Sequence, residues 1–292
     1  MIPTMASSRM NFLERVRGNQ DILHMPCDFY DALHLEVDAV LNIGSTSKVF
    51  RASSVDDADE IRAVKKFDLK NIHGEGEKLK RKVLTCARTW RLFLNEVSIL
   101  ERVNHPNIVS DVLGVACPNY LAISMEYCPN GNLLKRFKES TTEDVDRFFA
   151  GLVSALHYLH DQRIVHGNIR LENVFLDGFD EPILGDFGSS YIMPDDRSEV
   201  QITEASKGYT APEIKKNAGR VDPFKCDVFA LGVILRCLVV KRPPKENRKY
   251  YREIVKRDDI NNKFRFLLLV MLRKSPKKRF TMELVSDALR DY

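Results

Sequence analysis

Residues 165–188 carry the side chains of this chain that are best suited to metal and phosphate chemistry. Two short apolar runs in this range each lead into a polar loop, one with Asn168 and Asn173 and the other with Asp186. Amide and carboxylate oxygens are ligands of hard cations such as Mg²⁺, which keep water and phosphate oxygens as their other ligands. Where the fold brings the two loops together, Asn173 and Asp186 can hold Mg²⁺ against a polyphosphate.

The elements before these loops change from strands to helices along the chain. Apolar runs at 34–43, 49–52 and 61–67 have the length and spacing of antiparallel strands, and 121–125 is a further strand. Pro129 and Gly131 end that strand. The stretch 145–160 is apolar on one face, as in a packed helix, and leads directly into the polar loops. The chain is therefore predicted to be α+β.

The two polar loops resemble the catalytic loop and the Asp-Phe-Gly loop of eukaryotic protein kinases. Further stretches match that family's motifs in the same order, at 42–49, 63–65, 126–133, 211–213, 227–232 and 275–280. The resemblance covers about residues 30–290. It implies a bilobal protein-kinase fold, with an antiparallel-sheet N-lobe containing one main helix and a mainly helical C-lobe. The expected parts are a flexible lead-in at 1–29, an N-lobe at 30–127 and a C-lobe at 128–292.

The resemblance also implies ATP and Mg²⁺ as ligands. The residues that would bind ATP are Asn42, Ile43, Gly44, Val49, Ala63, Lys65, Glu96, Met125, Glu126 and Cys128. In the family, a Lys–Glu pair, here Lys65 and Glu96, holds the lysine against the α- and β-phosphates. The alternative for Lys65 and Lys66 is that both are surface lysines.

The turn at 42–49 is a weaker signal. Of the three glycines that the family uses to bring backbone N–H groups close to phosphate, only Gly44 is kept. Asn42 can adopt the left-handed backbone geometry, whereas Ser47 adds a Cβ. An ordinary hairpin turn is the alternative for this stretch.

Three further residues have structural roles by the same resemblance. Asp227 would brace the catalytic loop, and Arg279 would form an ion pair with Glu213. The segment between Gly188 and Ala211 is rich in hydroxyl side chains. It is either a phosphorylation segment or a loop kept soluble by its hydroxyls, and the sequence does not separate the two.

The chain departs from the family where the catalytic base is expected. The family has His-Arg-Asp, and this chain has His166-Gly167-Asn168. An Asn side chain has no basic oxygen at neutral pH, and general-base help contributes typically ~10²–10⁴ in rate. Gly167 removes the family's Arg that clamps a phosphorylated segment. Arg170, another candidate catalytic residue, occupies a position where serine/threonine kinases have Lys.

Two functions follow from these departures. The favoured one is a pseudokinase that binds nucleotide and signals through partner contacts. The alternative is a weakly active serine/threonine protein kinase that transfers the γ-phosphate of ATP to protein hydroxyls. The substrate or protein partner is not revealed by the sequence.

A basic insert at about 70–91 separates Lys65 from Glu96. Its apolar residues continue at three- and four-residue steps to Val97, which predicts an extra helix or an extension of the Glu96 helix. The insert is either a docking face for an acidic or phosphorylated partner or a solvated basic face. The sequence favours the solvated face.

Composition sets outer limits on the protein. The net charge of +4 over 292 residues does not favour bulk nucleic-acid binding, and no apolar run is long enough to span a bilayer. The six scattered cysteines are expected to be reduced thiols, and no signal peptide is expected. We expect residues 1–19 to be a disordered lead-in, with a transit peptide as the alternative, and no accessory domain after Arg279. The expected location is cytoplasmic, with the nucleus as the alternative.

Overall fold

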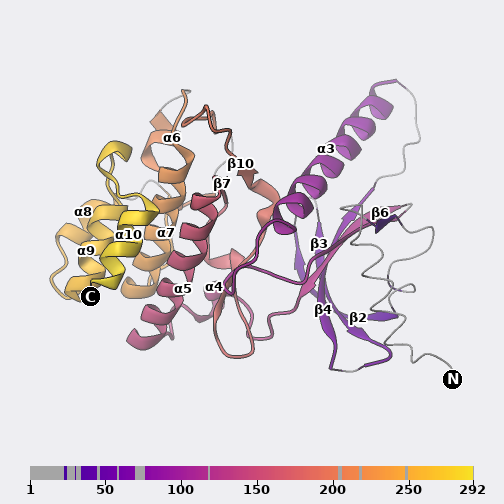
Figure 1. The fold of residues 1–292 in the computed structure, drawn as a ribbon, viewed down its shortest axis with the longest axis horizontal. Coiled ribbons are helices and arrows are strands. Elements are labelled where there is room, and N and C mark those ends of the chain that lie inside the picture. The colour runs from indigo at the N-terminus through magenta and orange to yellow at the C-terminus, as the bar shows by residue number, and fades with distance from the viewer. Residues whose placement is uncertain are drawn as a thin grey trace. The chain divides into compact units, whose positions relative to one another are not determined.

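The structure is a computed structural model that describes residues 23–24, 30, 34–44, 47–57, 59–69, 76–117, 119–202, 206–216, 219–246 and 249–291. The chain divides into two compact units (Figure 1). The first contains Met1–Arg102 and Ser110–Tyr127, and the second contains Val103–Val109 and Cys128–Tyr292.

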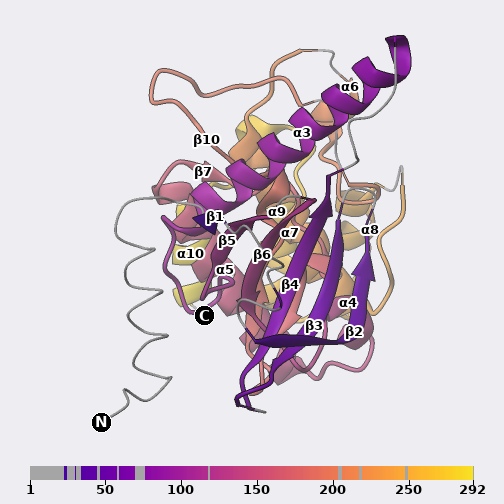
Figure 2. The same cartoon turned by 90° about the vertical axis from the view of Figure 1, so that its right-hand side faces the viewer.

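The first unit is built on a six-stranded sheet with the strand order β1-β5-β6-β4-β3-β2 (Figure 2). Its strands are β1 (Leu23–His24), β2 (Leu35–Ile43), β3 (Lys48–Ser54), β4 (Ile61–Asp68), β5 (Leu113–Ala116) and β6 (Tyr120–Glu126). All neighbours are antiparallel except β1, which pairs in parallel with β5. Leu23–His24, within the stretch expected to be a flexible lead-in, pair through their backbone groups with the edge of the sheet. The other residues of the lead-in lie outside the described part of the chain.

The sheet buries side chains on both faces because successive residues of a strand point in opposite directions. On one face, Val64 and Ala122 belong to a cluster with Leu35 and Val115. On the other face, Leu121 and Ile123 pack with side chains of α3 (Gly76–Leu100). The alternation places Lys65, the neighbour of Val64, on the face that carries α3.

Helix α3 is one continuous helix of 25 residues. Of the two possibilities for the basic insert, an extension of the Glu96 helix is therefore the one found. Phe93 and Val97 anchor the helix to the sheet and are fully buried. The N-terminal turns of α3 extend past the end of the sheet in both views (Figures 1 and 2).

The second unit is mainly helical. Its helices are α4 (Leu133–Arg136), α5 (Thr142–Asp161), α6 (Pro212–Lys216), α7 (Pro223–Val240), α8 (Tyr250–Val255), α9 (Asn262–Met271) and α10 (Met282–Arg290). Helix α5 begins at a capping box, in which Thr141 and Asp144 satisfy each other's backbone N–H groups. Helix α7 is buried along almost its whole length, and α5 and α9 pack against it.

Short strands around α5 and α7 carry the polar loops. They are β7 (Ile164–Val165), β8 (Val174–Leu176), β9 (Pro182–Leu184) and β10 (Tyr191–Ile192). Pairing of β8 with β9 and of β7 with β10 brings the loop at 166–173 next to the loop at 185–190. The predicted α+β architecture, an antiparallel sheet with one main helix followed by a helical part, is confirmed.

Candidate functional site

Lys65 and Glu96 form a close ion pair within the first unit. The Lys65 Nζ atom donates to both carboxylate oxygens of Glu96, at 2.7 and 2.8 Å. The Lys65 side chain is 12% exposed and that of Glu96 is 2% exposed. Strand β4 supplies the lysine and α3 the glutamate, so the pair joins the sheet to the helix.

The side chain of Lys66 has other surroundings than that of Lys65, because successive side chains of β4 point to opposite faces of the sheet. Its Nζ atom lies 4.0 Å from the ring centroid of Tyr120, a cation–π contact. The interpretation of Lys65 and Lys66 as two equivalent surface lysines is therefore wrong for Lys65.

The turn between β2 and β3 is a hairpin. Asn42 pairs with Val49 and Ile43 with Lys48, while the N–H of Gly44 donates to the carbonyl of Ser47 at 2.8 Å. Asn42 is a strand residue with negative φ, so the left-handed geometry that it could adopt is not used. Ile43 is 69% exposed, which leaves this apolar side chain accessible at the end of the strand.

The other predicted ATP-binding residues of the first unit lie on neighbouring strands. Ala63 on β4 is opposite Met125 on β6 in the sheet register. The N–H of Glu126 donates to the carbonyl of Ser110 at 3.2 Å, and the Glu126 carboxylate accepts from the N–H of Ser110 at 2.5 Å. Cys128, two residues after the end of β6, is already part of the second unit.

In the second unit, the two polar loops meet at Asp186. Its Oδ2 atom accepts hydrogen bonds from Asn168 Nδ2 at 2.9 Å and from Asn173 Nδ2 at 3.3 Å. The Asn173 amide also donates to the carbonyl of Asn168 at 2.9 Å. The structure thus brings together the predicted metal ligands, Asn173 and Asp186, and places Asn168 between them.

Both polar atoms of the Asn168 amide are engaged. While Nδ2 donates to Asp186, Oδ1 accepts a hydrogen bond from Ser206 Oγ at 2.7 Å. The side chain therefore has a fixed orientation and acts toward Asp186 as a neutral donor. Ser206 is a site residue that sequence reasoning missed, because 38 positions separate it from Asn168.

The donor set around Asp186 fits a magnesium ion. Asp186 is held in the left-handed region, with φ 62° and ψ 73°, a conformation that is uncommon for non-glycine residues and that Asp adopts more readily than most. Its carboxylate and the Asn173 amide oxygen are the hard oxygen ligands that Mg²⁺ combines with phosphate and water. No cluster of three His, Cys, Asp or Glu side chains suited to a metal occurs in the described ranges. A bound Mg²⁺ would supply positive charge that neutralises the phosphates.

His166 links the two loops as a neutral side chain. Its Nδ1 atom accepts from the N–H of Asn168 at 3.2 Å, and Nε2 lies 3.2 Å from the carbonyl of Gly185, to which it can donate. Burial lowers the pKa of His166, which stabilises the neutral form. The ring packs edge-on against Phe187, with the ring centroids 4.8 Å apart.

Asp227 holds the backbone of the first loop. Its carboxylate accepts from the N–H groups of His166 at 2.8 Å and Gly167 at 3.0 Å. His160 also approaches it at 3.3 Å and packs edge-on against Phe224. The bracing contact expected of Asp227 is present.

The expected pair of Glu213 and Arg279 is also present. Two nearly parallel hydrogen bonds of 2.6 and 3.0 Å join the guanidinium to the carboxylate. Both residues are buried, and Arg279 makes further bonds to the carbonyls of Arg273 and Lys225. The pair ties the start of α6 to the segment that precedes α10.

Arg170 is bound by a neighbour in the chain. Its guanidinium donates two hydrogen bonds to Glu172, at 2.9 and 2.5 Å, and these bonds raise the pKa of Arg170. Burial works against the charge of Glu172, but the bonds from Arg170 lower its pKa overall. Tyr209 completes the group, since its hydroxyl accepts from the N–H of Leu171 and lies 3.4 Å from Glu172. Sequence reasoning assigned no role to Glu172, although its charge two positions after Arg170 was a usable signal.

The hydroxyl-rich segment after Gly188 is partly structural. Ser190 is buried and donates to the carbonyl of His166 at 2.9 Å, and Tyr209 is buried beside Leu171. The Ser206 hydroxyl donates a hydrogen bond to Asn168, whereas Ser198 is exposed. Thr203 lies outside the described residues.

Five of the six cysteines fall in the part of the chain that the structure describes, and none of the five forms a disulfide: Cys86, Cys117, Cys128, Cys226 and Cys237. Cys27 lies outside that part. Among the described helices, none combines the length and hydropathy of a membrane span.

Comparison with known proteins identifies the family. Residues 35–289 match the protein kinase domain. The chain is 29% identical over 188 residues to the cell cycle serine/threonine-protein kinase CDC5/MSD2 of Saccharomyces cerevisiae, covering 62% of this chain and 27% of that protein. It is 28% identical over 263 residues to the CBL-interacting serine/threonine-protein kinase 19 of Arabidopsis thaliana, covering 85% of this chain and 51% of that protein. The chain thus spans about a quarter to a half of the length of these relatives.

The fold, the order of the motifs and the match over 35–289 agree with one another. An antiparallel sheet with the Lys65–Glu96 pair and a helical unit with the Asp186 loop are the two parts of the bilobal kinase fold. The chain belongs to the eukaryotic protein kinase family.

Proposed function

We propose that this chain is a nucleotide-binding pseudokinase domain, which acts in signalling through ATP binding and partner contacts rather than through efficient phosphoryl transfer. The proposal depends on the observation that both polar atoms of the Asn168 side chain are hydrogen-bonded within the protein. Its amide oxygen already accepts from Ser206, and its amide nitrogen donates to Asp186. A side chain engaged in this way has neither the charge nor an available basic oxygen to take the proton of a substrate hydroxyl.

Nucleotide binding is supported by what the site keeps. Two hydrogen bonds to Glu96 fix the position of the Lys65 ammonium group. Asp186 and Asn173 lie within hydrogen-bonding distance of each other, and both have side-chain oxygens of the type that binds Mg²⁺. These groups act on the nucleotide by charge and position, and neither effect depends on Asn168. We place the protein in the cytoplasm, with the nucleus as the alternative.

The second candidate is a weakly active serine/threonine kinase. It is favoured by the same retained residues, because positioning and electrostatics supply much of the rate of phosphoryl transfer. The relatives named above are serine/threonine-protein kinases, so the acceptor would be a Ser or Thr hydroxyl of a protein.

Two measurements on the purified chain separate these functions. Saturating Mg²⁺–ATP should raise the stability of the wild type, by about 2.7 kcal/mol at a hundredfold excess over Kd. Transfer of radiolabelled γ-phosphate to a protein substrate should not exceed that of Asp186→Ala. The absence of both a thermal shift and a calorimetric signal would reject nucleotide binding. Robust transfer that Asp186→Ala abolishes would establish the kinase instead.

A further inference from the structure

Residues 241–257 of the second unit, which form the loop after α7 and helix α8, are strongly basic. None of the kinase motifs named above lies in this range. Its described residues include seven basic side chains and two acidic ones, an excess of five positive charges, whereas the net charge of the whole chain is +4. Asn247 and Arg248 lie outside the described residues and are not counted.

Most acids in and next to this range are already paired with arginines. The pairs are Glu253 with Arg236, Asp259 with Arg257, and Asp258 with Arg265. Lys241 is also engaged, because its Nζ atom donates to the carbonyl of Ser140 at 2.6 Å. Five cations remain that are exposed and form no ion pair with a carboxylate of the described residues. These five make up the basic surface: Arg242, Lys245, Lys249, Arg252 and Lys256.

Three cations of the basic surface lie on one side of α8. Lys249 directly precedes the helix, Arg252 lies within it and Lys256 directly follows it, at steps of three and four residues. Tyr250 and Ile254 are buried on the opposite side of the helix. At 1.5 Å per residue, successive cations are roughly 5–6 Å apart along the helix.

The loop that carries Arg242 and Lys245 is fixed beside α8. The Arg236 side chain is fully buried, and its guanidinium donates to the carbonyl of Arg242 at 2.8 Å and to the Glu253 carboxylate at 2.8 Å. The Tyr250 hydroxyl accepts from the N–H of Lys245 at 2.8 Å. The backbone of the basic surface is therefore preorganised, so that binding a ligand costs little loop ordering.

The basic surface begins next to the segment that contacts Asn168. The Tyr250 hydroxyl lies 3.1 Å from the carbonyl of Gly208, two residues after Ser206. Ser206 is the residue whose hydroxyl donates to Asn168. Lys207, between Ser206 and Gly208, is exposed and adds a further positive charge. A ligand on α8 can therefore continue toward the Asn168 loop over a surface of one sign of charge.

We infer that the basic surface docks an extended, acidic segment of a partner protein, with Asp or Glu at alternate positions. Alternate side chains of an extended chain lie on one face, about 6.6 Å apart, which is close to the spacing of the cations along α8. Opposite charges at matching spacing give specificity and fast association. The inference deepens the proposed function, because it names the chemistry of the partner contacts on which that function depends.

Single-stranded nucleic acid fits this surface less well. Proteins that bind single strands combine a basic groove with exposed aromatic rings on which the bases stack. Here Tyr250 is buried, and the half-buried ring of Tyr251 is covered by the guanidinium of Arg273, 5.3 Å from its centroid.

The probe is a fluorescein-labelled peptide in which Glu alternates with Thr, a residue that favours extended chains. Fluorescence anisotropy with the full chain, without nucleotide, should show saturable binding at low salt. Binding should weaken as the salt rises above about 0.1 M, where charges are screened beyond about 10 Å. A matched peptide with Gln in place of Glu should not saturate.

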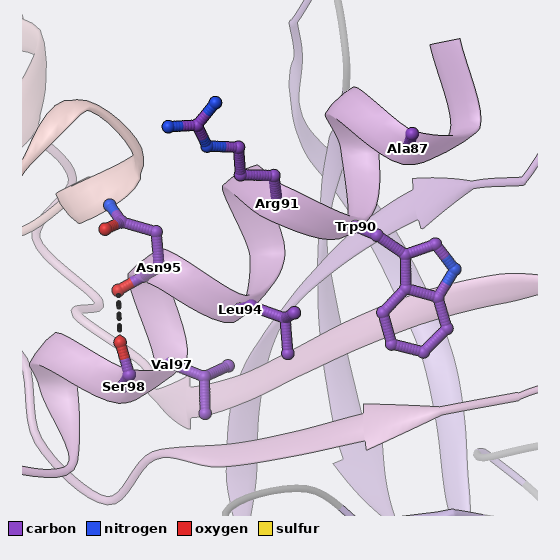
Figure 3. A pocket seen from close by; sticks show the side chains of 7 residues that line it. All are labelled: Ala87, Trp90, Arg91, Leu94, Asn95, Val97 and Ser98. Carbon is purple, nitrogen blue, oxygen red and sulfur yellow. Dashed lines mark hydrogen bonds between the residues drawn. The ribbon is translucent and has the colours of Figure 1, made fainter. Parts of the chain in front are cut away.

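Charge reversal in the middle of the stripe should weaken binding. Arg252→Glu should raise the Kd of the Glu peptide at least about tenfold, because a like charge then faces the ligand. Arg91→Glu is the matched control. Arg91 is also an exposed arginine on a helix, but it lies on α3 in the first unit, beside a groove lined by Trp90 and Leu94 (Figure 3). This variant changes the net charge equally and should bind as the wild type does.

Equal weakening by Arg252→Glu and Arg91→Glu would overturn the proposal, because the peptide would then respond to net charge alone. No saturation up to about 1 mM peptide would also overturn it. Tighter, Arg252-dependent binding of an oligothymidylate of equal charge would replace the protein partner with nucleic acid. If Arg252→Glu lowers the Tm, Lys256→Glu takes its place with the same expected loss.

The docking site and the proposed nucleotide binding fail separately. A chain that binds the Glu peptide but shows no thermal shift with Mg²⁺–ATP would count against nucleotide binding alone. A chain that shifts with Mg²⁺–ATP but does not bind the peptide would count against the basic surface alone.

Discussion

The two units differ in how far their site residues keep the charges typical of the kinase family. In the first unit, Lys65 and Glu96 form a charged pair with two short hydrogen bonds. In the second unit, Asp186 is held by the neutral amides of Asn168 and Asn173. The first unit thus keeps a charged pair, whereas in the second a neutral amide stands where the resemblance to the family places the catalytic Asp.

Removal of Lys65 tests the charged pair of the first unit and should have the largest effect on stability. Lys65→Ala leaves the Glu96 carboxylate, 2% exposed, without its two hydrogen bonds from the ammonium group. Breaking a buried ion pair on one side costs about 3–5 kcal/mol of unfolding free energy, which urea denaturation measures. The control is Arg290→Ala, whose pair with Asp287 is exposed and should contribute less than about 1 kcal/mol. Equal losses for the two variants would show that the Lys65 pair is not stabilising.

The contrast in the second unit is tested by replacing Asn168 with the Asp that is typical of the family. Asn168→Asp should raise γ-phosphate transfer to a serine/threonine peptide by about 10²-fold or more at saturating nucleotide. The new carboxylate would stand where an amide nitrogen now lies 2.9 Å from Asp186, so the variant should also require more Mg²⁺ to offset two adjacent negative charges. Asp186→Ala in the same background is the control and should abolish transfer.

A silent Asn168→Asp variant that still binds ATP would show that phosphoryl transfer lacks other groups as well, in either unit. Ser47 in the hairpin and Gly167 are the next candidates. The opposite result, a wild type already as fast as the variant, would show that Asn168 is not limiting.

Replacing Gly167 with the family's arginine should destabilise the protein, because the backbone at this position does not accommodate a side chain. Gly167 has φ +73°, and a Cβ at this position would lie 2.9 Å from the carbonyl oxygen of Ser189. Gly167→Arg should therefore lower the unfolding free energy by about 1–3 kcal/mol. Gly131→Arg is the matched control, because Gly131 has the same φ but its nearest contact is 4.0 Å away. If both variants lose the same stability, the contact with Ser189 has no effect.

The smallest effect concerns pH and the neutral His166. Because burial depresses the pKa of His166, the unfolded chain takes up a proton below its usual value of 6.5 while the folded chain does not. Stability should be complete above that pH and fall below it, by at most about 1.4 kcal/mol per pH unit for one proton. His166→Gln should remove part of this slope between pH 7.5 and 5.5 in thermal denaturation. An unchanged slope would contradict the assignment to His166.

Some features of the fold followed from local pattern. The apolar run at 61–67 predicted a strand, and Lys65 and Lys66 have different surroundings because successive side chains of a strand point to opposite faces. The three- and four-residue steps from Leu79 to Val97 predicted a helix, since the periodicity is a property of the sequence itself. Strands β1 and β5 were missed because both are short, and their assignment depends on pairing with a distant partner.

The sequence by itself determined the family, the two classes of element and the presence of Asn168 in the His166-Gly167-Asn168 loop, because motif order, periodicity and residue identity are all carried by the chain. Tertiary structure decided which groups Asn168 contacts. The Ser206 hydroxyl meets Asn168 across 38 positions, and Asp186 approaches it across 18. It also decided that Gly167 sits at positive φ against Ser189, and that Leu94 and Arg91 border one groove. Distances between residues far apart in the chain depend on packing and loop geometry, which no local pattern encodes.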